Sequence, residues 1–169
     1  PIMRNMKEQD ITWVFVFSTL FFQMGNHLQQ NLQNQCKKMN LKAKFLKDIP
    51  REHVIAAYKT SNLHAFPSQS ECGPIVLLES MAASKPWVAL NVGHVPDLRG
   101  GICVYSSSQK NGFLSFDQDV SRTFESSVNR IIADSNFATK LGEEGYIQIC
   151  QDYNWEIVKQ QYREFFENA

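Results

Sequence analysis

Two glutamates lie eight positions apart where a loop leads into a helix. Glu71 precedes the expected helix, and Glu79 lies about a turn and a half inside it. A carboxylate accepts hydrogen bonds from hydroxyl groups, so one of the two can hold a sugar and the other a ribose. In open α/β sheets, ligands bind beyond the carboxyl ends of the strands, where such loops occur. Two acids mean little among the 17 of this chain, and it is the loop between them that makes the pair a candidate site.

The loop-to-helix junction has the features of an anion site. Pro74 is expected at the first helical position, where its fixed φ and missing N–H are both suitable. Gly73 just before it lets a ligand approach the backbone closely. The first free amides then belong to Ile75 and Val76, and free amides at a helix N-terminus bind anions. We therefore expect a phosphate between the two glutamates.

Strand and helix patterns alternate along the chain and would position this junction. Short apolar runs rich in β-branched and aromatic residues predict strands, and apolar residues three or four apart predict helices. The expected strands are 13–17, 43–46, 63–66, 87–90 and 102–105, and the expected helices lie within 28–39, 51–59, 74–83, 120–132, 137–141 and 155–165. The first strand is expected to be buried on both faces. This α/β alternation predicts a doubly wound, Rossmann-like parallel sheet with a helical C-terminal tail.

Composition limits the class of protein. The 169 residues are 43% hydrophobic, which predicts one soluble globular domain, and 17 basic and 17 acidic residues give a net charge of zero. That balance argues against nucleic-acid binding, which needs a concentrated basic surface. The apolar run 11–22 is shorter than the roughly 20 residues of a membrane span and lacks the flanks of a signal peptide. Cys36 and Cys103 fit a reducing compartment as small apolar residues, and no Cys/His spacing indicates a metal site.

Several segments, in order, resemble one enzyme family. The segment 71–82 (ECGPIVLLESMA) resembles the E-x7-E segment of the retaining GT-B glycosyltransferases of group 1, family 4 in the sequence classification. The segment 45–52 (FLKDIPRE) resembles the family's "FLG-x-V-P-x-E" turn, and 58–68 resembles its "Y-x-x-[AS]-D-v-x-x-x-P-S" strand. The segments 85–89 (KPWVA), 92–97 (VGHVPD) and 153–156 (YNWE) resemble "KPVVA", "VGGIPE" and "FSWE". The matches extend from about residue 11 to residue 166.

The resemblance implies a role for each matching residue. Glu71 would be the catalytic residue that contacts the hydroxyls of the transferred sugar, and Glu79 would contact the nucleotide ribose. The amides of Ile75 and Val76 would hold the diphosphate. The complete set of expected donor-binding residues is Gly73, Ile75, Val76 and Glu79, with Lys47, Asp48 and Ile49 in a turn that would border the base, largely through backbone groups.

The resemblance also implies an activity. Residues 1–169 would be the half of a GT-B enzyme that binds a nucleoside-diphosphate sugar, while an upstream domain absent from this chain would bind an acceptor glycan or lipid-linked sugar. The implied reaction is retaining hexosyl transfer to an acceptor hydroxyl in polysaccharide or glycoconjugate synthesis, without metal or other cofactor. The chain begins at Pro1, which suggests an excised fragment, and alone it is expected to be inactive. The full-length protein is expected in the cytoplasm, with peripheral association with the inner face of the membrane left open.

Four features depart from the family pattern. Pro74 replaces a common glycine, and Gly73 stands where an aromatic residue is frequent. His94 occupies a position usually held by a small residue, so it either points into the cleft or is structural. The family's Arg and Lys phosphate clamp normally follows the domain's first strand, and that stretch is absent here; Arg4 and Lys7 do not carry its motif.

Other interpretations stay open. A nucleotide-sugar 2-epimerase shares the architecture but has a Gly-rich segment that this chain lacks, and a non-catalytic nucleotide-binding module of flavodoxin-like shape is a third alternative. Lys47 is equally well explained as a solvated side chain. His64 fits a buried or edge histidine better than a catalyst. Asp117 and Asp119 have the spacing of a metal-binding DxD, but they precede an amphipathic helix and fit a helix cap better.

Overall fold

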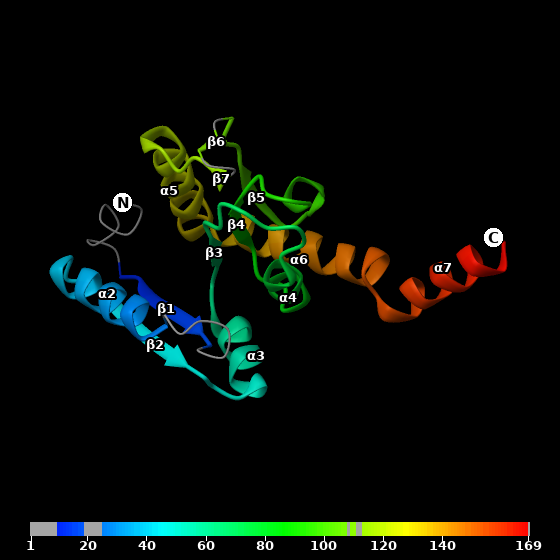
Figure 1. Ribbon diagram of the computed structural model, residues 1–169, viewed down its shortest axis with the longest axis horizontal. Coiled ribbons are helices and arrows are strands. Elements are labelled where there is room, and N and C mark those ends of the chain that lie inside the picture. Colours follow the sequence, from blue (N-terminus) through cyan, green and yellow to red (C-terminus); the bar gives the residue numbers. More distant parts are fainter. Residues whose placement is uncertain (1–9, 19–24, 108, 111–112, 169) are drawn as a thin grey trace. The chain divides into compact units, whose positions relative to one another are not determined.

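A computed structural model describes residues 10–18, 25–107, 109–110 and 113–168 (Figure 1). The chain forms two compact units, Pro1–Ala57 and Tyr58–Ala169. The parallel strands expected in one sheet lie in two parallel sheets, one in each unit.

The first unit contains a parallel pair of strands and a helix. Strands β1 (Thr12–Phe17) and β2 (Lys42–Lys47) pair in parallel from Thr12↔Lys42 to Phe17↔Lys47. Helix α2 (Gly25–Lys38) connects them and packs against β2, burying Cys36 to 3% exposure as its apolar stripe predicts. The side chain of Leu28, assigned to the same stripe, lies outside the described residues. Helix α3 (Arg51–Thr60) follows β2 and leads into the second unit.

The prediction that the first strand is buried on both faces is wrong. Exposed and half-buried residues alternate along β1, with Val14 47% and Val16 42% exposed. Phe15 on the other face stacks on Phe45 of β2, with ring centroids 5.0 Å apart. An uninterrupted apolar run shows only that both faces of a strand could be buried. It cannot show whether a second layer covers both of them.

The second unit is built around a three-stranded parallel sheet. Its order is β3 (His64–Phe66), β4 (Trp87–Leu90), β5 (Gly101–Val104), with β4 in the centre (Figure 1). All four residues of β4 are fully buried. Helix α4 (Ile75–Ala82) contacts β3 and β4 and packs against α6 (Ser135–Asp152). Helix α5 (Gln118–Ala133) packs against β4, β5 and α6, and a 3-10 turn, η1, covers Val95–Asp97.

A short antiparallel hairpin interrupts the stretch expected to be a polar loop. Strands β6 (Gln109–Lys110) and β7 (Phe113–Leu114) each contain two residues. The sequence prediction of a loop over 106–112 is therefore wrong at 109–110, which form β6. A strand of two residues is too short to show the alternation of apolar and polar residues that predicts a strand. The prediction therefore followed the turn-forming residues of 106–112.

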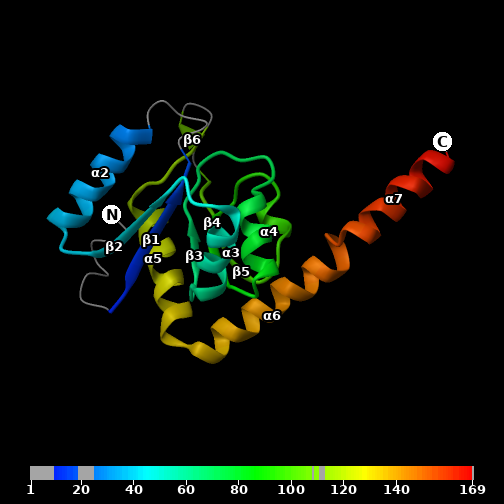
Figure 2. The ribbon, with the colours of Figure 1, turned by 90° about the horizontal axis from the view of Figure 1, so that it is seen from below.

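The C-terminal tail is helical, as predicted. Helix α7 (Trp155–Glu167) follows α6 and extends away from the sheet of this unit (Figure 2). The side-chain oxygen of Asn154 accepts a hydrogen bond from the Glu156 amide at 2.9 Å, which confirms the predicted N-cap. The helix buries none of its residues, and its exposed aromatic side chains are Trp155, Tyr162, Phe165 and Phe166. In the part of the chain that the structure covers, no helix has both the length and the apolar character that crossing a membrane requires.

Candidate functional site

The junction between Glu71 and Glu79 lies at the carboxyl end of β3, where α4 begins. Pro74 is the N-cap of α4, with φ −72° and ψ 94°, so the helix starts one residue later than predicted. The expectation that Pro74 occupies the first helical position is corrected, because its extended ψ lies outside the helical range. The Leu77 amide donates to the Pro74 carbonyl at 3.0 Å. The amides of Ile75 and Val76 have no partner within the helix, as the anion-site argument requires.

Hydrogen bonds from a distant hairpin hold the loop that precedes α4. The Leu114 amide of β7 donates to the Gln69 carbonyl at 3.0 Å, and Gln69 Nε2 donates to the Leu114 carbonyl at 2.7 Å. Within the loop, the Ser68 hydroxyl donates to Glu71 Oε1 at 2.9 Å. Glu71 is exposed, and Ser68 therefore fixes one carboxylate oxygen while the side chain stays open to solvent.

The end of the loop presses against the turn that contains Gly93 and His94. The Cys72 carbonyl accepts hydrogen bonds from the His94 amide and from His94 Nδ1, both at 3.2 Å. Gly93 has φ 51°, and a Cβ on it would lie 2.2 Å from the Cys72 oxygen. Glycine is required here for two reasons: the left-handed backbone, and the close approach of the loop carbonyl.

Glu79 is half-buried on α4 and lies near the histidine that begins β3. The His64 ring packs edge-on against Tyr58 at 5.3 Å and against Phe66 at 5.8 Å, and its Nδ1 is buried. Burial lowers the pKa of His64 to about 4, against the negative charge of Glu79 and the nearby Val76 backbone, which both raise it. His64 is therefore neutral at pH 7 and belongs to the apolar support beneath α4.

The structure brings five of the eight predicted site residues together. Glu71, Gly73, Ile75, Val76 and Glu79 all lie within this one junction of the second unit. The other three lie in the first unit, in the turn after β2: Lys47 ends the strand, Asp48 follows with φ 49°, and Ile49 is half-buried. The Asp48 amide donates to the Phe17 carbonyl at 3.1 Å.

Three residues that support the junction were not found from the sequence. Ser68 belongs to the matched strand segment, and its position three residues before Glu71 is a local signal that could have identified it. Gln69 and Leu114 are 45 residues apart and carry no local signal of their pairing.

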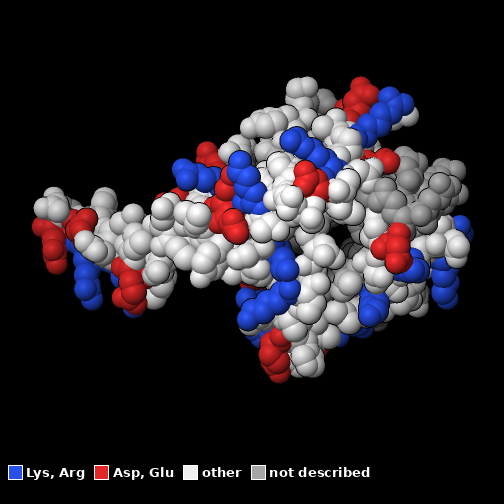
Figure 3. Space-filling model, turned by 180° about the vertical axis from the view of Figure 1, so that it is seen from behind, with Lys and Arg blue, Asp and Glu red and all other residues white. Residues whose placement is uncertain are grey.

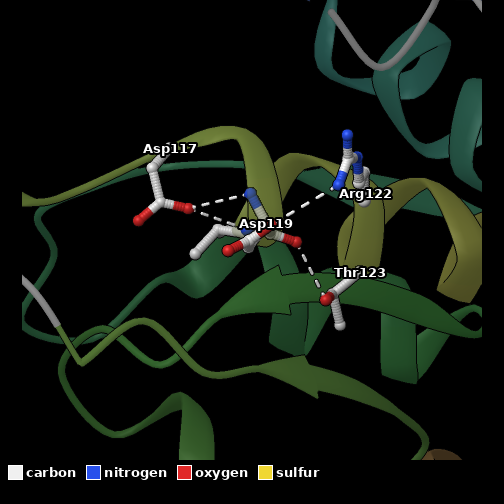
Figure 4. Close-up of polar contacts among 5 residues, drawn as sticks. Asp117, Asp119, Arg122 and Thr123 are labelled. Carbon is white, nitrogen blue, oxygen red and sulfur yellow. Dashed lines mark hydrogen bonds and ion pairs between the residues drawn. The ribbon is translucent and has the colours of Figure 1, made fainter.

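The Asp117–Asp119 pair is a helix cap, as the simpler of its two interpretations predicts. Asp117 Oδ1 accepts hydrogen bonds from the amides of Asp119 at 3.0 Å and Val120 at 2.9 Å (Figure 4). Asp119 Oδ1 lies 3.7 Å from Nη1 of Arg122, one helical turn later. The Asp119 backbone carbonyl accepts a hydrogen bond from the Thr123 hydroxyl. Among the described residues, no group of three or more His, Cys, Asp or Glu side chains is arranged to hold a metal ion.

Charged side chains of both signs are interspersed over the protein surface seen in Figure 3. Lys and Arg lie next to Asp and Glu on that face, without a single-sign field.

Comparison with known proteins shows the same architecture in glycosyltransferases. Residues 3–148 match the family model described as glycosyl transferases group 1. The D-inositol 3-phosphate glycosyltransferase of Corynebacterium urealyticum is 26% identical over 125 residues, which cover 74% of this chain and 27% of that protein. A sucrose-phosphate synthase from Thermosynechococcus elongatus has a TM-score of 0.74 at 22% identity, over 99% of this chain and 42% of the synthase. Anabaena Alr3699/HepE, solved with UDP-glucose, has a TM-score of 0.74 at 20% identity, over 99% of this chain and 44% of its own.

The chain thus spans about a quarter of the curated relative's length. The family match covers most of the chain and includes the whole junction from Glu71 to Glu79. This chain belongs to the group 1 glycosyl transferases.

Proposed function

We propose that this chain binds a nucleoside-diphosphate sugar and presents it for retaining hexosyl transfer to an acceptor hydroxyl. It would act as the donor-binding domain of a longer enzyme of polysaccharide or glycoconjugate synthesis. The observation that carries this proposal is the start of α4, where the amides of Ile75 and Val76 lie between an exposed and a half-buried glutamate. The UDP-glucose bound by the structurally similar Anabaena protein supports the choice of ligand class.

The chemical task at such a site is to release a diphosphate from the anomeric carbon. Negative charge grows on the leaving diphosphate, and the free amides and dipole of α4 stabilise that charge. Glu71, held on one oxygen by Ser68, accepts a hydroxyl hydrogen of the transferred sugar with the other. Glu79, on the flank of the same helix, accepts hydrogen bonds from the ribose hydroxyls. The proton of the acceptor hydroxyl passes to the departing phosphate oxygen. The free amides at the start of α4 stabilise the charge on the leaving diphosphate in this scheme, in place of a metal ion.

Calorimetric titration of residues 1–169 with UDP, GDP and ADP tests the nucleotide part of the proposal. The Glu79→Ala variant is expected to weaken binding of the preferred nucleotide without lowering the melting temperature, because the side chain lies at the site and is not part of the buried core. Glu143→Ala, at an exposed position of α6, is the matched control and should bind normally. Equal affinity in wild type and Glu79→Ala would remove Glu79 from the site.

Glu71→Gln in the full-length enzyme tests the sugar part. The amide keeps the shape and loses the charge, so free nucleoside diphosphate should bind almost normally. The transfer rate should fall more than tenfold, which corresponds to more than about 1.4 kcal/mol of transition-state stabilisation. Near-wild-type kinetics would contradict the assignment. A matching loss of nucleotide affinity would place Glu71 at the phosphates instead. Residues 1–169 alone should show no transfer, and addition of EDTA to the full-length enzyme should leave its rate unchanged.

A further inference from the structure

Two departures from the family pattern meet in the structure. Gly73 stands where the family frequently has an aromatic residue, and His94 stands where it usually has a small one. A Cβ built on Gly73 would lie 3.0 Å from His94 Cε1 and 3.2 Å from His94 Nδ1. The imidazole therefore lies directly beside the α-carbon of Gly73, in the space that a side chain there would enter. The His94 ring thus takes the place of the aromatic side chain that is missing at Gly73.

Hydrogen bonds fix the orientation of this ring. The carbonyl of Cys72, the residue before Gly73, lies 3.2 Å from both the amide nitrogen and Nδ1 of His94. A carbonyl oxygen can only accept, so Nδ1 carries the hydrogen in this bond. In the neutral ring the other nitrogen, Nε2, is then a hydrogen-bond acceptor with its lone pair in the ring plane.

That acceptor is unused among the described residues. Nε2 of His94 is shielded from solvent and has no hydrogen-bond partner in the part of the chain that the structure describes. A buried polar atom without a partner is unfavourable and rare in native proteins. Because Nε2 is covered in the folded chain, a ligand must displace the groups that cover it, and a hydrogen bond that it donates to Nε2 would remove this cost. The loop that holds the ring also carries Glu71, a second acceptor two residues before Gly73.

We propose that His94 is a sugar-selecting residue of the donor site. Its ring takes the place of the side chain absent at Gly73, and its Nε2 accepts a hydrogen bond from a hydroxyl of the transferred sugar. This inference rests on the proposed function, because it assumes that the sugar lies beside Glu71 and Gly73. Both Glu71 and Nε2 accept hydrogen bonds, so the pair favours a sugar with two free hydroxyls on this side. A deoxy sugar that lacks one of these hydroxyls would leave an acceptor unpaired and would bind less well.

Two substitutions separate the nitrogens of the ring. Asparagine places an amide near the position of Nδ1, so His94→Asn can keep the bond to the Cys72 carbonyl while losing the acceptor at Nε2. Glutamine reaches one bond further, so His94→Gln can restore an acceptor near Nε2. The measurement is the dissociation constant, in the full-length protein, of the preferred nucleotide sugar and of the free nucleoside diphosphate, each by calorimetry.

The expected result is an increase in the ratio of the nucleotide-sugar dissociation constant to the nucleoside-diphosphate dissociation constant. His94→Asn should weaken nucleotide-sugar binding about three- to tenfold, the value of one neutral hydrogen bond, while nucleoside-diphosphate binding stays at the wild-type level. His94→Gln should recover most of the loss. A ratio in His94→Asn equal to that of wild type would overturn the proposal.

Gly73→Ala is a second test that leaves the histidine in place. Its Cβ would meet Cε1 at 3.0 Å, so the ring must shift by a few tenths of an ångström, and the ratio of the nucleotide-sugar Kd to the nucleoside-diphosphate Kd should rise here too. If His94→Asn does not fold, as judged from its melting temperature, the Gly73→Ala ratio decides, and an unchanged value refutes the role of His94. Wild-type protein that binds no nucleoside diphosphate would instead refute the proposed function.

Discussion

Gly93→Ala should destabilise the second unit and disorganise the candidate site together. Gly93 has φ 51°, a conformation that costs an L-residue about 1 kcal/mol. Its new Cβ would also lie 2.2 Å from the Cys72 carbonyl oxygen, and this contact must open by about 1 Å or more to reach ordinary packing distance. The movement breaks the two hydrogen bonds that the Cys72 carbonyl oxygen accepts from the amide and Nδ1 of His94. Each lost bond lowers the free energy of unfolding by about 1 kcal/mol. The free energy of unfolding should therefore fall by about 2–4 kcal/mol.

Urea unfolding followed by circular dichroism measures this change, and Gly145→Ala is the matched control. At Gly145, inside α6, a new Cβ would lie 3.1 Å from Met81 Cγ and 3.3 Å from the Gly100 α-carbon, contacts that a shift of a few tenths of an ångström relieves, and alanine is the better helix former. That variant should stay within about 1 kcal/mol of wild type. Calorimetry on Gly93→Ala should in addition show weaker nucleoside-diphosphate binding, since the loop before α4 has moved. The reasoning fails if Gly93→Ala is as stable as Gly145→Ala and binds nucleotide normally.

Two further predictions concern stability. The pKa of His64 falls from 6.5 to about 4 on folding, so the unfolded chain binds the proton first and stability is lost as the pH falls from about 6.5 to 4. The wild type should lose about 2 kcal/mol between pH 7 and pH 4.5 through this group, and His64→Phe, measured by urea unfolding at both values, should show a smaller loss; an identical loss would contradict the assignment. Ser84→Gly should raise the free energy of unfolding by up to about 1 kcal/mol, because exposed Ser84 has φ 54° just after α4; a lower melting temperature would refute the strain argument.

The elements that local residues specify were predicted well from the sequence. Strand β4 has the predicted bounds, and the helices that follow Asp117 and Asn154 begin with the predicted caps. Each of these signals comes from side chains within a few residues of the feature. The exposure of Val14 could not be predicted in this way, because it depends on what packs against β1 from elsewhere in the chain. The hairpin after β5 was missed because its strands are too short to carry a pattern.

The candidate site shows the same division between residue type and position. The two glutamates were predicted as site residues, and the helix start was placed to within one residue, from local chemistry. The loop that carries Glu71 is held by partners 45 residues away at Leu114 and 22 residues away at His94. For this reason Gly73 and His94 look like two unrelated exceptions in the sequence, one small where a large residue is common and one large where a small residue is common. In the folded chain the Cys72 carbonyl binds His94 next to Gly73. The His94 ring then fills the space beside the Gly73 α-carbon that a larger side chain at position 73 would occupy. A substitution that restores the family residue at only one of the two positions should therefore disturb the site more than restoring both.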